Sequence, residues 1–155
     1  MRAVVQRVSG ASVESAGAGR AMLGPGLMVL AAVMEGDGAE DREWMSEKLV
    51  HLRIFPDADG KMNRSLLDIH GEMLLVSNFT VGGDARSGRR PSFDRAMRPP
   101  AAREAFDALV SAVRGLGVPV RTGEFGAHMM VEIRNDGPVT IVLDSRESGT
   151  RLSPG

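Results

Sequence analysis

Cysteine and tyrosine are absent from this 155-residue chain. Without cysteine there can be no disulfide, no thiolate zinc site and no cysteine nucleophile, which fits a reducing compartment. Aromatic residues are few, one Trp and five Phe, so stacking on nucleic-acid bases is restricted to few positions. The longest apolar run, residues 26–34, is much too short to cross a bilayer. We therefore expect a soluble, cytoplasmic protein with no membrane partner and no signal peptide.

The chain also has no large excess of either charge, and its net charge is −1. That balance argues against a protein that coats nucleic acid, and DNA is not an expected partner, although a local basic patch is compatible with it. The length fits one domain that buries its own core. We expect that domain to cover residues 1–144, and the polar residues 145–155 to form a mobile tail.

The apolar pattern predicts a single α/β domain in which two helices cover a sheet. Runs of alternating or continuous apolar residues indicate strands, and apolar residues at helical spacing indicate the two helices. The expected strands are 3–8, 11–15, 27–33, 72–76, 118–122, 129–134 and 139–143, and the expected helices run from Glu40 to Arg53 and from Pro100 to Leu116.

Two stretches have the composition of turns. Asn135-Asp136-Gly137-Pro138-Val139-Thr140 separates the last two expected strands, and on local rules it is a hairpin connection. The stretch from Asp57 to Lys61 resembles a calcium loop, but Lys61 and Met62 stand where an EF-hand needs an oxygen ligand and a glycine. We interpret it as a turn.

Ser77-Asn78-Phe79-Thr80 follows the buried strand 72–76, and the end of a core strand is a reasonable place for a site. Ser77 and Thr80 are candidate nucleophiles, but the three histidines are dispersed and no Gly-x-Ser-x-Gly elbow is present. No group of His or carboxylates has the spacing of metal ligands, so we expect no metal and no cofactor. An enzyme built from these residues would act through positioning and backbone dipoles.

Cations occur in two places of interest. Five arginines cluster in a loop-like segment that can pair with phosphates or simply face water: Arg86, Arg89, Arg90, Arg95 and Arg98. Arg7 is a lone cation in the first strand, where an edge position facing water is the ordinary interpretation.

Taken together, these segments resemble the D-aminoacyl-tRNA deacylase family along nearly the whole chain. Residues 1–8, the segment from Arg53 to Asn63 and Arg90-Pro91-Ser92-Phe93 carry part of the resemblance. Most of the specificity comes from the 135–140 motif and from Ser77-Asn78-Phe79-Thr80, where the family usually has Ser-Gln-Phe-Thr. Asn78 is the departure, and its shorter side chain puts the role of this position in question.

The resemblance implies a homodimer with a three-layer α/β/β arrangement, acting as a carboxylic ester hydrolase on D-aminoacyl-tRNA. It implies that the Gly137-Pro138 bond is cis and that this loop reaches into the active site of the other subunit. Main-chain carbonyls of Gly137 and Pro138 would then occupy the space that an L side chain needs, and Arg7 would support the loop. Glycine would escape this filter, so glycyl-tRNA, including glycine mischarged on tRNA(Ala), is an expected substrate.

The resemblance also implies that Ser77, Asn78, Phe79 and Thr80 hold the aminoacylated 3′ adenosine. Phe79 would lie against the base and backbone N–H groups would lie near the ester carbonyl. Thr80 would position the substrate while the ribose 2′-OH assists attack by water. Arg89 and Arg90 are expected contacts to acceptor-stem phosphates. Two other functions stay open: a non-catalytic RNA- or protein-binding module, and a related deacylase with relaxed chirality.

Overall fold

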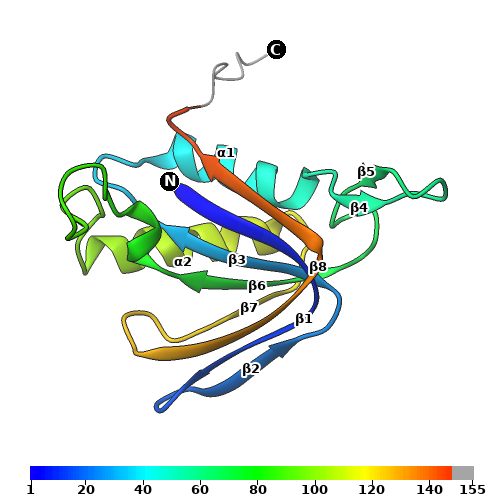
Figure 1. The fold of residues 1–155 in the computed structure, drawn as a ribbon, viewed down its shortest axis with the longest axis horizontal. Coiled ribbons are helices and arrows are strands. Elements are labelled where there is room, and N and C mark those ends of the chain that lie inside the picture. The colour runs from blue at the N-terminus through cyan, green and yellow to red at the C-terminus, as the bar shows by residue number, and fades with distance from the viewer. Residues whose placement is uncertain (148–155) are drawn as a thin grey trace.

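One long, bent strand organises the fold. The computed structural model describes residues 1–147, and in it β1 extends over Arg2–Ser15. Every other strand of the main sheet pairs with β1 or with a strand added to it (Figure 1). The remaining elements are β2 (Gly19–Leu23), β3 (Gly26–Ala32), α1 (Ala39–His51), β4 (Phe55–Pro56), β5 (Met62–Arg64), β6 (Glu72–Ser77), the 3₁₀ turn η1 (Phe79–Gly82), α2 (Ala101–Gly115), β7 (Val120–Thr122) and β8 (Met129–Asp144).

The two halves of β1 have different neighbours. Its first half pairs antiparallel with β3, from Arg2 opposite Ala32 to Val8 opposite Gly26, and β6 and β7 then add in parallel. Its second half pairs antiparallel with β2, from Ala11 to Ser15. β8 pairs with both halves and follows β1 along its length (Figure 1). The sheet is therefore strongly curved, and its β1–β2–β8 end folds back so that β2 contacts β6 and β7.

Apolar side chains form two separate cores. The larger core contains Leu49 of α1, Leu109 of α2 and the inward residues of the sheet, such as Val5 and Leu75. The smaller core contains Val13, Leu23, Met28 and Leu74, with partly buried residues of β8 packed against it. Since alternate residues of a strand face opposite sides, Leu74 and Leu75 contribute to different cores. The two helices thus cover one face of the sheet, and the β1–β2–β8 end folds over the other.

Both helices follow their sequence signals. α1 begins after Gly38, whose N–H donates to Asp41 Oδ2 at 3.0 Å, and Glu40 adds negative charge to the first turn. α2 begins after Pro100 and buries Phe106, Leu109, Val110 and Val113 along one face. The predictions of two helices, of the central strands and of a single α/β domain are confirmed.

Two predictions about the strands are wrong. The expected strands 3–8 and 11–15 are one strand, because Ser9 is accommodated as a bulge between Val8 and Gly10. The expected hairpin at 135–140 does not exist: residues 129–144 are one strand that keeps its direction, and both of its halves pair with β1 rather than with each other. The turn residues favour a hairpin locally, but no hairpin forms because both halves of the strand pair with β1.

The other sequence predictions have simple outcomes. Asp57 closes the β4–β5 turn, since its carboxylate accepts from the N–H groups of Asp59 and Lys61 at 2.9 and 3.0 Å, as the turn interpretation requires. Among residues 1–147 no helix is long and apolar enough to cross a membrane. Of the expected tail, Ser145 is buried and its N–H donates to the Met1 carbonyl at 2.9 Å. Residues 148–155 lie outside the described part of the chain.

Candidate active site

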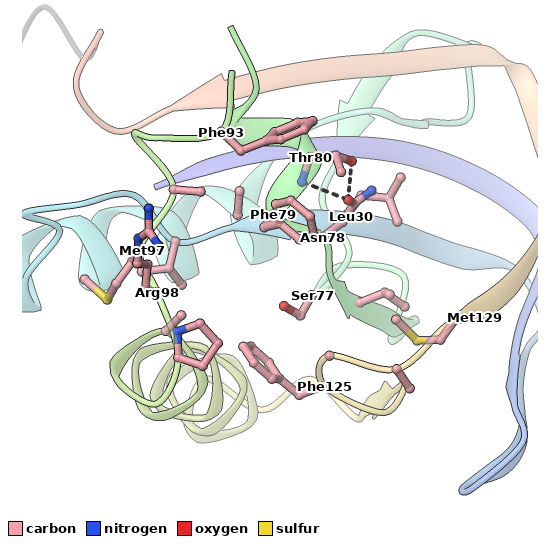
Figure 2. Close-up of a pocket in the computed structure, with 18 of the residues that line it drawn as sticks. Leu30, Ser77, Asn78, Phe79, Thr80, Phe93, Met97, Arg98, Phe125 and Met129 are labelled. Carbon is pink, nitrogen blue, oxygen red and sulfur yellow. Dashed lines mark hydrogen bonds between the residues drawn. The ribbon is translucent and has the colours of Figure 1, made fainter. Parts of the chain in front are cut away.

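A cavity of about 1070 Å³ opens at the end of the sheet where β3 and β6 finish. Its floor is apolar, with Leu30, Ala32 and Val76 from these strands. Its walls come from segments far apart in sequence: residues 77–80, 90–99 and 125–131. Figure 2 shows Ser77 near the middle of this arrangement, with Phe79 and Phe93 on one side and Phe125 on the other. Carboxyl ends of parallel strands are the usual place for ligand sites in α/β proteins.

The segment from Ser77 to Thr80 is shaped by its own side chains. β6 ends at Ser77, and the N–H of Asn78 donates to the carbonyl of Ala31 on β3 at 2.8 Å. Asn78 is the N-cap of η1: its Oδ1 accepts from the Thr80 N–H at 3.1 Å and from the Thr80 hydroxyl. Asn is a preferred capping residue and Gln is not, because only the shorter side chain reaches back to this position. Asn78 therefore has a structural role that the usual Gln of the resembled family could not fill in the same way.

One backbone donor in this segment is left over. The N–H groups of Asn78, Thr80 and Val81 all donate to partners within the protein. The N–H of Phe79 forms no hydrogen bond with any of residues 1–147. Phe79 lines the cavity, so this donor can bond to water or to a ligand there.

Phe79 presents an exposed ring at the cavity mouth. The residue is 57% exposed, and its ring forms a T-shaped contact with Phe93 at a centroid distance of 5.2 Å and an interplanar angle of 79°. Gly83 permits this contact, since a Cβ there would lie 2.9 Å from both the Phe93 ring and the Thr80 carbonyl oxygen. Phe93 thus fixes one side of the Phe79 ring, and the exposed remainder is open to a ligand.

Phe93 itself is positioned by two short pairings. Asp84 and Ser92 exchange backbone hydrogen bonds of 2.8 Å in each direction, which closes the arginine-bearing loop between them. The chain then lies across the end of β3, where Met97 donates to the Val33 carbonyl at 2.9 Å. This path brings Arg98 to the cavity wall.

The clustered arginines have different roles. Arg86 is bound by Asp84 through several hydrogen bonds; this pairing lowers the pKa of the Asp84 carboxyl and raises that of the Arg86 guanidinium. Arg90 and Arg98 line the cavity, and their guanidinium groups form no ion pair or hydrogen bond within the described part of the chain. Arg89 is exposed on the same loop and does not line the cavity.

The opposite wall is the segment between β7 and β8. Phe125 packs against Phe106 of α2, with centroids 6.1 Å apart. Arg103, also on α2, lies over the Phe125 ring at 5.1 Å and donates to the Phe125 carbonyl at 3.2 Å. His128, which the sequence did not single out, lines the cavity as well.

The 135–140 motif lies outside the cavity. Asp136 to Val139 stand opposite the single residue Arg7 of β1, so they form a wide bulge in β8. Asn135 closes the bulge: its Oδ1 accepts from the Val139 N–H at 2.7 Å and its Nδ2 donates to the Val139 carbonyl at 3.1 Å. The Gly137-Pro138 peptide bond is cis, and both residues are exposed.

Arg7 contacts the bulge through its guanidinium group. Its side chain is 14% exposed, and it donates from Nε to the Asp136 carbonyl at 3.0 Å and from Nη1 to the Ile54 carbonyl at 2.7 Å. The Asp136 carboxylate adds an ion pair at 3.4 Å. Arg7 is therefore not the water-facing edge residue that the local pattern favoured, since it links the bulge to the β4–β5 segment.

The chemistry available in the cavity is that of positioning. Among residues 1–147 no three His or carboxylate groups gather as metal ligands. The Thr80 hydroxyl donates to an amide oxygen, which is not a general base. Ser77 to Thr80 and Arg90 are together in one cavity, as a single site requires, whereas Arg7, Gly137 and Pro138 are together elsewhere on the same chain. Phe125 and His128 gave no sequence signal, because only the tertiary fold brings them to this wall.

The family model and the curated relatives agree on one family. The family model described as D-Tyr-tRNA(Tyr) deacylase matches residues 4–144. A D-aminoacyl-tRNA deacylase of Syntrophomonas wolfei is 56% identical over 147 residues, which are 95% of this chain and 99% of that protein. One of Dehalococcoides mccartyi is 53% identical over 154 residues, 99% of each chain.

Solved structures share the fold. A structure titled c-Myc DNA unwinding element binding protein has a TM-score of 0.88 and 38% identity, and the match covers 93% of this chain and 98% of that one. A probable eukaryotic D-amino acid tRNA deacylase has a TM-score of 0.76 at 19% identity, over 92% and 97% of the two chains, which shows likeness of fold alone.

Proposed function

Since this chain belongs to the D-Tyr-tRNA(Tyr) deacylase family, we propose that it hydrolyses the ester bond of D-aminoacyl-tRNA and spares L-aminoacyl-tRNA. The hydrolase class follows from the family and from curated relatives about half identical over nearly the whole chain. One observation supports the assignment to a site: at the end of β6, Phe79 lines the cavity with an exposed ring and a backbone N–H that has no partner among residues 1–147.

In this proposal the Phe79 ring stacks on the terminal adenine and the Phe79 N–H donates to the ester carbonyl oxygen. Negative charge develops on that oxygen as water adds to the carbonyl carbon, and a fixed donor stabilises it. The bond from the carbonyl carbon to the ribose 3′ oxygen then breaks. The proton of the attacking water passes to this oxygen with help from the ribose 2′-OH, giving free D-amino acid and tRNA.

Thr80 positions the substrate rather than attacking it. Its hydroxyl proton is directed to Asn78 Oδ1, and no base lies beside it among the contacts described. We expect Thr80→Ala to keep a substantial part of its turnover. Complete loss of turnover, with fold and tRNA affinity unchanged, would assign the attack to Thr80. His128→Gln, which removes the cavity's imidazole, should likewise stay within about threefold of wild type.

Chiral selection requires the Gly137-Pro138 bulge to reach a cavity that it does not line in its own chain. A second copy of the chain in a homodimer would supply it. Main-chain carbonyls of Gly137 and Pro138 then take the space of an L side chain, while a D side chain points away. Glycine has no side chain to exclude, so glycyl-tRNA, including glycine on tRNA(Ala), is hydrolysed too.

The decisive assay uses the pure protein with D- and L-forms of one aminoacyl-tRNA and with glycyl-tRNA. We expect ester loss from the D-form and from glycyl-tRNA, and none from the L-form above the rate without enzyme. Loss of the L-form at a comparable rate would indicate a deacylase of relaxed chirality.

A second candidate is nucleic-acid binding without catalysis, favoured by the likeness to the structure titled c-Myc DNA unwinding element binding protein. The same assay, with tRNA binding measured beside it, separates the two, since binding without loss of any ester would support this candidate. For tRNA, the exposed Arg89 and the cavity-lining Arg90 are the proposed phosphate contacts. If these arginines contact phosphates, the affinity for tRNA should fall as the salt concentration rises.

A further inference from the structure

Met34, which follows β3, lies behind the cavity and contacts two of its walls. We propose that Met34 is a positioning residue of the deacylase site: its backbone holds the wall at residues 96–98, its side chain holds the end of η1, and the buried Asp37 carboxylate fixes Met34 itself. The proposal rests on the deacylase function proposed above. Met34 is 1% exposed and does not line the cavity, so it acts on the site through other residues.

The backbone of Met34 holds the wall that contains Met97 and Arg98 (Figure 2). Met34 stands opposite Ala96 in an antiparallel bridge. Backbone hydrogen bonds of 2.9 Å flank this bridge on both sides, one donated by the Glu35 N–H and one by the Met97 N–H. Because these bonds join the two segments directly, a shift of Met34 moves this wall of the cavity.

The side chain of Met34 packs against a second wall, at the end of η1. A Cβ at Gly82 would lie 2.7 Å from the Met34 sulfur and 3.1 Å from its Cε. Gly82 is buried, and it is the last residue of the turn that begins at Phe79. The absence of a side chain at Gly82 lets this turn lie directly against Met34. The Met34 side chain therefore sets how close η1, and with it the Phe79 N–H, lies to the sheet.

Asp37 fixes Met34 through both of its backbone groups. The Met34 N–H donates to Asp37 Oδ2 at 2.6 Å, and the Asp37 N–H donates to the Met34 carbonyl at 3.0 Å. The carboxylate is fully buried, and its charge is balanced by the Met1 ammonium at 2.8 Å and by the Arg146 guanidinium at 3.1 Å. A buried charge needs such partners. The turn after β3 therefore cannot move without breaking a buried ion pair.

The Phe79 N–H makes this packing matter for the reaction. This N–H is the donor that the proposed function assigns to the ester oxygen, and a misplacement of about 1 Å can reduce a rate by about 10²-fold. The exposed Phe79 ring and Arg89 are less restricted by Met34, so binding of the tRNA should be less sensitive. Disturbing Met34 is thus expected to lower kcat more than it raises KM.

Gly82→Ala tests the contact, because its methyl group must displace either the Met34 side chain or the turn. We expect kcat for D-aminoacyl-tRNA to fall about tenfold, with KM within about twofold of wild type. Gly71→Ala is the matched control, since a Cβ there would lie 2.5 Å from Cδ1 of the buried Leu66, but Gly71 is at the opposite end of β6 from the cavity. Equal losses of kcat in the two variants would overturn the proposal.

A compensating change in Met34 separates positioning from general strain. Met34→Val removes the sulfur and Cε that the new methyl group would meet, and the double variant with Gly82→Ala keeps the number of side-chain heavy atoms. We expect the double variant to recover kcat to within about threefold of wild type, since volume-conserving core changes are tolerated best. Urea unfolding of each protein is measured in parallel. Recovery of stability without recovery of kcat would make Met34 a packing residue alone.

Asp37→Asn should give the same pattern, because the Met1 ammonium and Arg146 lose their shared carboxylate. We expect kcat to fall about fivefold with little change in KM. Asp144→Asn is the control: this carboxylate pairs with Arg2 at 2.6 Å in the same region but forms no bond to Met34. Its kcat should stay within about twofold of wild type. Equal loss of kcat in the two variants would remove Asp37 from the positioning role, and if Asp37→Asn does not fold, Gly82→Ala and its compensated form decide.

Amide hydrogen exchange follows the two walls without any need for turnover. In Gly82→Ala the amides of Glu35, Met97 and Gly83 should exchange at least about tenfold faster than in wild type, and those of β1 should be unchanged. Faster exchange at these amides, with no ester hydrolysed by wild type, would support the role of Met34 in shaping the cavity and contradict the deacylase function. Hydrolysis by wild type, with exchange and kcat unchanged in Gly82→Ala, would do the reverse.

Discussion

The segment from Ser77 to Thr80 ends the short strand β6, whereas the bulge from Asp136 to Val139 interrupts the long strand β8, and the backbone groups of the two are hydrogen-bonded differently. The first ends a strand at a cavity and leaves the Phe79 N–H without a partner among residues 1–147. The second lies outside the cavity and is tied down by Asn135 and Arg7. An open donor suits a group that binds substrate, and a fixed backbone suits a group that excludes one.

Removing the ring of the first region should have the largest effect. Phe79→Ala is expected to lower kcat/KM for D-aminoacyl-tRNA about thirtyfold, because stacking on a base contributes about 1–3 kcal/mol. Stability should change little, since the residue is 57% exposed. Steady-state kinetics with urea unfolding as the control measures both. A drop in stability without a drop in kcat/KM would make Phe79 a packing residue.

Distorting the second region should affect selectivity rather than rate. Gly137 has φ +144°, and a Cβ there would lie 2.8 Å from the Val139 nitrogen and 2.7 Å from its Cγ2. We expect Gly137→Ala to reduce D-over-L discrimination about tenfold while D-turnover stays within threefold. Competing D- and L-aminoacyl-tRNA in one reaction gives the ratio.

Gly60→Ala is the matched control for that change. Gly60 also has a positive φ, +78°, but nothing lies within 4 Å of a Cβ there, and the residue is in the β4–β5 turn. Discrimination should be unchanged in this variant. If both variants lost discrimination equally, general strain would be the cause rather than the bulge.

The cap on η1 should have a smaller effect on the first region. Asn78→Ala removes the acceptor for the Thr80 N–H and hydroxyl, and loss of an N-cap costs about 1 kcal/mol. We expect kcat/KM to fall about fivefold. Asn78→Ser keeps a short acceptor and should recover most of the loss; failure of Ser to do so would mean that the amide contacts the substrate directly.

Acid should lower the free energy of unfolding without changing D-selectivity, which depends on the two regions. Burial raises the pKa of Asp41, but hydrogen bonds from Ser145 and Gly38 and nearby positive charges outweigh it, so the pKa lies below its usual value. The unfolded carboxyl therefore binds a proton first as pH falls, and the stability that Asp41 adds is complete above about pH 4 and lost below it.

Urea unfolding at pH 7 and pH 3 measures this effect. The loss of stability between pH 7 and pH 3 should be smaller in Asp41→Asn than in wild type. Asp107→Asn is the control, because Asp107 is on the exposed side of α2, and its loss should equal that of wild type. D-selectivity between pH 6 and 8 should be the same in all three proteins. An equal loss at pH 3 in wild type and Asp41→Asn would remove Asp41 from the acid response.

Sequence patterns predicted what local chemistry determines. The apolar runs at 27–33 and 72–76 are buried strands, and the stripe from Phe106 to Val113 is one face of a helix. The motif from Ser77 to Thr80 lines a cavity, as its place at the end of a core strand suggested.

Long-range pairing explains what the sequence could not show. The turn residues at 135–140 indicated a hairpin, but they form a bulge because β1 continues past them on both sides. Arg7 looked like a surface cation, and its partner Asp136 is distant in sequence. Phe125 lies at the cavity in contact with Arg103 and Phe106 of α2, which precede it by about 20 residues.

A mixed dimer tests most directly whether the two regions act together across two copies of the chain. One protomer carries Phe79→Ala and the other Gly137→Ala, each with its own affinity tag, so that the heterodimer can be purified. If the bulge acts in its partner's cavity, one of the two sites is fully native, and the heterodimer should show about half the wild-type D-rate with wild-type discrimination. Hydrolysis of the L-form at half or more of the rate of the Gly137→Ala homodimer, or a protein that is monomeric and selective in solution, would contradict this arrangement.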